Sequence, residues 1–149
     1  MNDQADKLRQ LNEMSGTARS AVLKPLQTKA RVITVTSGKG GVGKTNFTIG
    51  LALAFARMDK KVMVIDADLG LSNVDVLLGC SPPGNLFQVL QSGYSLNDVV
   101  ADGPLGIKFI SGGSGIYDLS NLSDAQLHYF MNQIGQFDAW ADIILIDTG

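Results

Sequence analysis

The residues whose types and spacing could do chemistry begin at Gly38, where the run GKGGVGKT matches the pattern G-x-x-x-x-G-K-[ST] in full. Such a loop binds phosphate, because its glycines let backbone N–H groups turn inward around the phosphate oxygens. We expect Lys44 to contact the outer phosphates and the Thr45 hydroxyl to bind Mg²⁺. The predicted nucleotide-binding residues are Gly38, Lys39, Gly40, Gly41, Val42, Gly43, Lys44, Thr45 and Asn46.

Three carboxylates stand where apolar runs end, with Asp66 and Asp68 after KVMVI and Asp147 after IILI. Ligands of open α/β sheets bind at the carboxyl edge of the strands. We interpret Asp66 as a Mg²⁺-binding residue that acts through water, and Asp68 as the residue that positions the attacking water. Asp147 is interpreted as a second carboxylate near the metal. Two solvated carboxylates that cap a turn are the alternative for Asp66 and Asp68.

A second lysine, Lys39, follows the first glycine of the loop. Phosphoryl transfer is accelerated by positive charge that meets the developing negative charge, and such a group supplied in trans can be worth about 10³–10⁵ in rate. If two copies of the chain face each other across their nucleotides, each Lys39 can reach the other copy's phosphates. We therefore predict a homodimer that forms with nucleotide and uses Lys39 in catalysis. A lysine that faces solvent is the alternative.

These residues need a scaffold of alternating strands and helices. Buried strands are predicted at 31–36, 61–66, 107–111 and 142–147, and helices at about 45–58 and 123–137. Near-continuous Val and Ile runs separated by helices predict an α/β fold with a doubly wound, mostly parallel sheet covered on both faces. Ser123, with Gln126 three residues later, predicts a capping box at the start of the second helix.

The chain is expected to have three parts. Residues 1–14 have the pattern of a short amphipathic helix, with Ala5, Leu8 and Leu11 at spacings of three. Residues 15–30 suit a linker, and 31–149 would be the N-terminal part of a nucleotide-binding domain. The sequence stops directly after its last strand, where a doubly wound sheet would ordinarily continue, so we expect the domain to be incomplete at the C-terminus. An isolated helix as short as 1–14 is marginal in water, so we expect it to lie against its own domain or a partner.

Composition narrows the class of protein. The 149 residues are 45% hydrophobic and 17% charged, which favours one packed globular domain. The net charge is 12 − 14 = −2, which predicts no general affinity for nucleic acid. A single cysteine, Cys80, and the lack of a signal-peptide pattern predict a cytoplasmic protein.

Three segments resemble known motifs. KGGVGKT from Lys39, DADLGLSNVD from Asp66 and IDTG from Ile146 resemble the deviant Walker A, switch I and Walker B segments of the MinD/ParA P-loop ATPases. The fuller wording VTSGKGGVGKTN, together with DQADKLR from Asp3, is similar to one branch of that family, the flagellar-number regulator FlhG, also called FleN or YlxH. The likeness covers residues 3–11 and about 31–149.

The resemblance implies an ATPase that uses ATP and Mg²⁺ and dimerises with ATP to regulate the number and placement of flagella. By the same resemblance, Lys39 is the signature lysine that acts across the dimer, Asp68 aligns the water and Asp147 is linked to Mg²⁺. The N-terminal helix would stimulate an SRP-type GTPase, FlhF, with Gln4 delivered to its nucleotide site. Leu8 and Arg9 belong to the same motif.

Further partners follow from the resemblance alone. They are flagellar switch proteins or a flagellar transcription activator, and the inner face of the cell membrane, bound reversibly through a C-terminal helix that this sequence does not contain. No direct DNA binding is expected.

Other readings stay open at this point. One alternative is a ParA-type partition ATPase, which would hold DNA on a basic surface. The net negative charge and the N-terminal D-Q-A-x-x-L-R motif argue against this alternative. A nucleotide-binding adaptor would bind ATP without useful hydrolysis, and a P-loop small-molecule kinase would not need Lys39. His128 is interpreted as a surface or partly buried histidine, Cys80 as a loop or core thiol, and the run SGGSG from Ser111 as a flexible connection.

Overall fold

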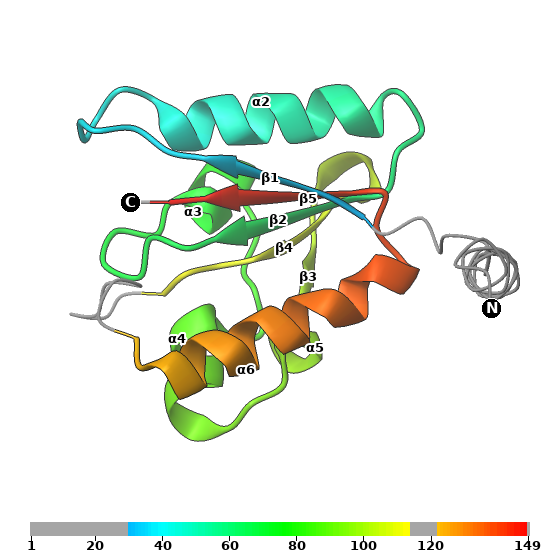
Figure 1. The fold of residues 1–149 in the computed structure, drawn as a ribbon. Coiled ribbons are helices and arrows are strands. Elements are labelled where there is room, and N and C mark those ends of the chain that lie inside the picture. The colour runs from blue at the N-terminus through cyan, green and yellow to red at the C-terminus, as the bar shows by residue number, and fades with distance from the viewer. Residues whose placement is uncertain (1–29, 114–121, 149) are drawn as a thin grey trace, which may run out of the picture.

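A computed structural model of the chain describes residues 30–113 and 122–148. Its centre is a five-stranded sheet with the strand order β1-β5-β2-β4-β3 (Figure 1). The strands are β1 (Arg31–Val35), β2 (Val62–Asp66), β3 (Ala101–Asp102), β4 (Lys108–Ile110) and β5 (Ile143–Asp147). The first four strands in this order, β1, β5, β2 and β4, run parallel to one another, and β3 pairs antiparallel with β4. The predicted mostly parallel α/β fold is therefore confirmed.

Helices cover both faces of this sheet, as predicted. In Figure 1, α2 (Lys44–Ala56) lies over one face, and α4 (Leu86–Ser92), α5 (Leu96–Val99) and α6 (Asp124–Gly135) lie against the other. The remaining elements are α3 (Val74–Leu78), η1 (Pro104–Gly106) and η3 (Gln136–Ala139). The helices α3, α4 and α5 and the strand β3 were not predicted from the sequence.

Strand β2 shows why a continuous apolar run suits a central strand. Successive side chains point to opposite faces of a sheet. Val62 and Val64 pack in the cluster beneath α2, and Met63 and Ile65 pack in the cluster that holds the helices of the other face. Every residue of β2 is buried, because both faces of the strand meet apolar side chains.

The prediction of a buried strand is wrong for β1. This strand lies at the edge of the sheet and pairs only with β5. Its residues are exposed or half-buried, and Val32 keeps 50% of its surface in contact with solvent. The sequence pattern predicted a strand correctly, but burial depends on neighbours that the described residues do not supply on this side.

Helix α6 begins as predicted. The Ser123 side chain accepts a hydrogen bond from the Gln126 backbone N–H at 3.3 Å, and the Gln126 side chain accepts one from the Ser123 N–H at 3.0 Å. Phe130 and Ile134 are the buried residues of the helix, and Phe137 is buried in the η3 turn that follows. His128 is exposed, as expected for a surface histidine.

The segment after β4 is not a flexible connection over its described part. Ser111 and Gly112 are buried, and the Ser111 carbonyl accepts a 2.7 Å hydrogen bond from the Leu86 N–H at the start of α4. A Cβ at Gly112 would lie 2.5 Å from the Asp68 carbonyl oxygen and 2.9 Å from that of Asp66. Glycine is therefore required here, because the backbone after β4 touches the backbone after β2.

We predict that Gly112→Ala lowers the free energy of unfolding by about 1–3 kcal/mol, since the added methyl group meets backbone that has no rotamer to change. Gly50→Ala is the matched control, because Gly50 lies inside α2 and a Cβ there meets nothing within 4 Å. The control is expected to raise the same free energy by about 0.5–1 kcal/mol. Urea denaturation of both variants makes the comparison, and equal values for the two variants would contradict the close approach at Gly112.

Candidate functional site

The loop between β1 and α2 has the backbone of an anion site. Gly41 and Gly43 adopt left-handed conformations, with φ of 71° and 92°. Gly43 precedes α2 without a side-chain cap, so the first N–H groups of this 13-residue helix point forward without a capping partner among the described residues. Free N–H groups at the positive end of a helix dipole bind phosphate. The local geometry therefore agrees with the predicted phosphate loop.

A cavity of about 690 Å³ lies against this loop. The predicted residues that line it are Gly40, Gly41, Gly43, Lys44, Thr45 and Asn46. Gly38, Lys39 and Val42 do not line it, and the Lys39 side chain is exposed. The loop thus turns one lysine toward the cavity and leaves the other outside.

The opposite wall of the cavity comes from the loop of residues 67–73 between β2 and α3, and from α3 itself. This wall consists of Asp68, Leu71, Asn73, Val76 and Leu77. Leu71 and Val76 keep 75% and 73% of their surfaces exposed, so the cavity has an apolar rim. The sequence analysis did not identify these rim residues, although LGLSNVDVLL shows apolar side chains directly after the two aspartates.

Asp66 and Asp147 end neighbouring strands at the same level. They are register partners in the β2–β5 pair, and Val64 and Leu145, two residues earlier on each strand, pack beneath α2. Because side chains alternate along a strand, both carboxylates point to the α2 face, where the phosphate loop lies. Each is 1% exposed. The structure therefore places both predicted carboxylates under the loop.

Asp66 is held by hydrogen bonds from the 67–73 loop and from the start of α3. Its Oδ2 atom accepts hydrogen bonds from the Ser72 hydroxyl at 2.8 Å and from the N–H groups of Asn73 and Val74 at 3.1 and 3.3 Å. Its Oδ1 atom accepts from the Asp68 N–H at 3.0 Å. Three of these four donors reach Oδ2 and one reaches Oδ1, which keeps room for a further donor. Asp66 therefore holds the 67–73 loop in place, and its water-mediated role at Mg²⁺ stays a prediction.

Burial raises the pKa of the Asp66 carboxyl, and the same hydrogen bonds act in the opposite direction.

Asp68 faces the cavity from the start of the 67–73 loop. Its Oδ1 atom accepts from the N–H groups of Gly70 and Leu71 at 3.1 and 3.0 Å. Its Oδ2 atom has no hydrogen bond to any described residue, and the side chain is half-buried. This arrangement fixes the carboxylate and leaves one oxygen available. The role of positioning water stays a prediction.

Asp147 is the second buried carboxylate of the site. Its Oδ1 atom is fully buried and has no hydrogen-bond partner among the described residues. Burial raises the pKa of its carboxyl, and the Asp68 charge adds to this, while the Thr45 hydroxyl and the Lys44 charge lower it. A buried anionic oxygen without a partner is costly unless a cation or donor completes it. Thr45 and Asp147 therefore fit a bound Mg²⁺.

No group of three or more His, Cys, Asp or Glu side chains within residues 30–113 and 122–148 is placed to hold a metal ion. Mg²⁺ bound by one or two protein oxygens and by substrate phosphates needs no such group. The donor set of Thr45 and Asp147 is of this kind.

Four other residues singled out from the sequence lie outside the cavity or outside the described residues. Gln4, Leu8 and Arg9 lie outside the described residues. Cys80 is half-buried, and its thiol donates to the Leu78 carbonyl at 3.4 Å, as expected for a loop or core thiol.

The sequence pattern of the CobQ/CobB/MinD/ParA nucleotide binding domain matches residues 33–139. The chain belongs to this family. Among curated relatives, it is 42% identical over 118 residues to the antiactivator FleN of Pseudomonas aeruginosa, covering 79% of this chain and 42% of FleN. It is 37% identical over 120 residues to the flagellum site-determining protein YlxH of Helicobacter pylori, covering 80% of this chain and 40% of YlxH.

The fold is similar to that of the septum site-determining protein MinD of Pyrococcus horikoshii, solved in complex with Mg-ADP. The TM-score is 0.64 at 27% identity, and the match covers 80% of this chain and 50% of that one. The chain thus spans about 40% of the length of the two curated relatives and half that of the solved structure. The resemblance to the FleN/YlxH branch of the MinD/ParA family is confirmed.

None of the helices described in 30–113 and 122–148 combines the length and apolar character needed to cross a bilayer.

We predict that Asp147→Asn raises the free energy of unfolding of the nucleotide-free protein at pH 7 by about 1 kcal/mol, because it removes a desolvated charge. A raised pKa means that the folded wild type binds its proton more tightly than the unfolded chain does. Its stability is therefore highest at low pH and is lost as pH rises through the raised pKa. The advantage of Asp147→Asn should accordingly disappear near pH 4.

Urea denaturation at both pH values measures this difference. Asp138→Asn, at a half-buried carboxylate remote from the cavity, should change stability by less than about 0.5 kcal/mol at either pH. Excess Mg²⁺ and ADP should stabilise the wild type more than Asp147→Asn. An equal loss of stability in Asp147→Asn at both pH values would contradict the unpaired charge.

Proposed function

We propose that this chain binds ATP and Mg²⁺ and works as an ATPase switch that regulates the number and placement of flagella. The observation that carries the proposal is the buried, unpaired Oδ1 atom of Asp147 beneath a phosphate loop that supplies Lys44 and Thr45. The similarity to FleN, an antiactivator, and to YlxH, a flagellum site-determining protein, supports the flagellar role.

The chain's own groups bind the nucleotide in this proposal. Backbone N–H groups of the phosphate loop and the start of α2 surround the phosphate oxygens, and Lys44 adds a full positive charge. Thr45 and Asp147 would hold Mg²⁺ beside the phosphates. Bound Mg²⁺ neutralises charge that develops on the phosphates. The Asp68 oxygen without a partner accepts a hydrogen bond from the water that attacks.

Catalysis is proposed to need a second copy of the chain. Lys39 is exposed and lies outside the lining of its own cavity, so its charge is available to a facing molecule. The apolar rim of Leu71, Val76 and Leu77 surrounds the same opening and would be buried by that molecule. Exposed apolar side chains grouped around a cavity mark interaction sites. The second copy would thus cover the nucleotide and supply the lysine that its partner lacks.

The output is proposed to be recruitment of other proteins. The 1–14 segment, with Gln4, Leu8 and Arg9, would stimulate an FlhF-type SRP GTPase. Flagellar switch proteins or a flagellar transcription activator are further partners, in keeping with the word antiactivator in the name of FleN. The resemblance further suggests a cytoplasmic protein that reversibly visits the inner face of the cell membrane.

Two lysines of one loop allow a sharp test. Lys44→Ala is expected to weaken ADP binding by about 10–100-fold, because hydrogen bonds to charged groups contribute about 1.5–3 kcal/mol. Lys39→Ala should leave ADP affinity within about twofold, since its side chain lies outside the cavity. ATP turnover per chain should rise with protein concentration in the wild type, and Lys39→Ala should lower the dimer's rate by about 10³-fold.

Fluorescent-nucleotide titration and phosphate release measure these effects. A turnover that is independent of concentration would contradict action in trans. Nucleotide binding without turnover at any concentration would favour the adaptor that binds ATP and hydrolyses nothing useful. Equal loss of ADP affinity in both variants would contradict the separate roles of the two lysines.

The partner proposal has its own test. The wild-type chain should accelerate GTP hydrolysis by the FlhF-type GTPase, and Gln4→Ala should reduce that acceleration by about 10-fold or more, as expected when a water-positioning side chain is removed. Gln10→Ala, at a second glutamine of the 1–14 segment, is the control and should retain the effect. Stimulation that survives Gln4→Ala would refute the assigned role of Gln4.

A further inference from the structure

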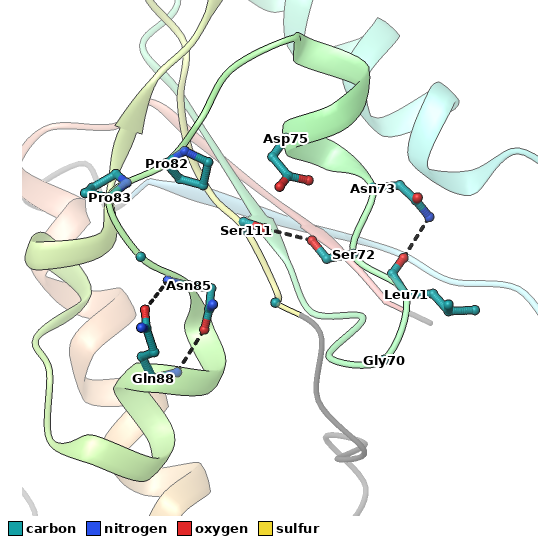
Figure 2. A pocket seen from close by; sticks show the side chains of 12 residues that line it. Gly70, Leu71, Ser72, Asn73, Asp75, Pro82, Pro83, Asn85, Gln88 and Ser111 are labelled. Carbon is teal, nitrogen blue, oxygen red and sulfur yellow. Dashed lines mark hydrogen bonds between the residues drawn. The ribbon is translucent and has the colours of Figure 1, made fainter.

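A second cavity, of about 510 Å³, lies on the other side of the 67–73 loop from the phosphate loop. Its walls come from three segments, residues 70–75, 82–88 and 111–113 (Figure 2). Leu71 and Asn73 line both cavities, so the 67–73 loop is a wall shared between them. The volume is that of an ordinary ligand site, for which about 300–1,000 Å³ is typical. The proposed ATPase chemistry does not use this space.

One wall of the second cavity carries a negative charge. Asp75 is the one ionisable side chain in its described lining, and no lysine, arginine or histidine accompanies it. The Oδ1 atom of Asp75 accepts from the Val76 N–H at 2.9 Å. The Oδ2 atom has no hydrogen bond to a described residue, and the side chain is half-buried. The cavity therefore offers an anionic acceptor that a cation can complete.

The facing wall offers two N–H donors. Asn85 and Gln88 form the capping box of α4, in which each amide oxygen accepts the other residue's backbone N–H at 3.0 Å. These bonds decide which way both amides point, because only an oxygen can accept from an N–H group. The nitrogens Asn85 Nδ2 and Gln88 Nε2 are left without partners among the described residues. Figure 2 shows Asn85 and Gln88 on the opposite side of the cavity from Asp75.

We propose that the second cavity binds an arginine side chain on a peptide segment of a partner protein. A guanidinium group completes Asp75 through a charge-assisted hydrogen bond. The two amide nitrogens need a neutral acceptor close to that cation, and the backbone carbonyls of a peptide supply it. A ligand with a cation alone would leave both amides unpaired, and an anionic ligand would meet the charge of Asp75.

Hydrogen bonds join the floor of the second cavity to the buried carboxylate of Asp66. The Ser72 hydroxyl donates to Asp66, so in its 2.9 Å contact with Ser111 the Ser111 hydroxyl must be the donor. Ser72 Oγ also accepts from the Gly112 N–H at 3.1 Å. A ligand that moves this floor moves the loop that holds Asp68. Binding in one cavity should therefore change affinity in the other, an effect that rests on the proposed nucleotide function.

The binding step is tested on the whole chain without nucleotide. The probe is the peptide acetyl-Gly-Arg-Gly-amide, and its match is the same peptide with neutral, nearly isosteric citrulline. We expect the arginine peptide to shift the side-chain amide signals of Asn85 and Gln88 in NMR spectra. Asp75→Asn and the citrulline peptide should each weaken binding by about tenfold or more. Asp124→Asn is the control, because Asp124 also lies in the first turn of a helix but does not line this cavity.

Three outcomes would overturn the proposed site. They are equal binding of the citrulline peptide, unchanged binding by Asp75→Asn, and an absence of amide shifts at millimolar peptide. Putrescine, a cation without an acceptor, should bind about tenfold more weakly than the arginine peptide. Equal binding would assign the cavity to a free polyamine and overturn the assignment to a peptide.

The coupling step is tested by ADP titration with and without saturating arginine peptide. We expect the peptide to change ADP affinity by about fivefold or more in the wild type, in the range of ordinary coupling between sites. Ser72→Ala, which removes the Ser72 hydrogen bonds to Asp66 and Ser111, should reduce that change, and peptide affinity is measured separately in this variant. An unchanged ADP affinity with bound peptide would overturn the coupling. Failure of ADP binding without any peptide would instead overturn the proposed function and leave the peptide result standing.

Discussion

The buried carboxylate of Asp66 is the constraint on which the rest of the site depends. Burial in the sheet edge removes water from its oxygens, and the 67–73 loop and the first residue of α3 replace that water with one hydroxyl and three backbone N–H groups. Such a group is stable in the interior only while these donors stay in place. The loop therefore has one favourable course, which aims Asp68 at the phosphate loop and turns Asp75 to the opposite side.

Two carboxylates at the same level of neighbouring strands differ in their hydrogen bonding. Asp66 is completed by its own chain, whereas Asp147 Oδ1 has no partner among residues 30–113 and 122–148. Burial alone cannot account for the contrast, because both side chains are 1% exposed. The contrast leaves Asp147 with a buried oxygen that no donor among those residues reaches. A cation at Asp147 thus removes a cost that folding by itself leaves in place.

The sequence predicted those parts of the structure that local residue patterns determine. The strands β2 and β5 and the capping box of Ser123 and Gln126 follow from local residues, and so does the position of the phosphate loop. Burial of β1 could not be predicted, because it depends on strands beside it rather than on Val32 or Ile33. The helices α3, α4 and α5 have four to seven residues each, too few for a clear period.

The roles of the aspartates were the hardest part to predict. Asp66 and Asp68 are two residues apart and chemically identical, so their spacing shows a shared edge but not which oxygen is already occupied. That distinction arises from the course of the 67–73 loop, which brings the Ser72 hydroxyl and the Asn73 N–H back to Asp66. Ser72 is itself held by Ser111 and Gly112, about 40 residues further along the chain, and contacts at that separation leave no periodic signal in a single sequence.

The two edge strands of the sheet, β3 and β1, differ in length and in exposed charge. On one side, β3 has only two residues and carries the exposed Asp102, which binds Lys108 at 2.6 Å. On the other, β1 presents five residues of extended backbone with no strand among the described residues beyond it. Short, charged edges discourage added strands, and long open ones invite them. An extension of this sheet, whether by the same polypeptide or by another molecule, is therefore favoured beside β1.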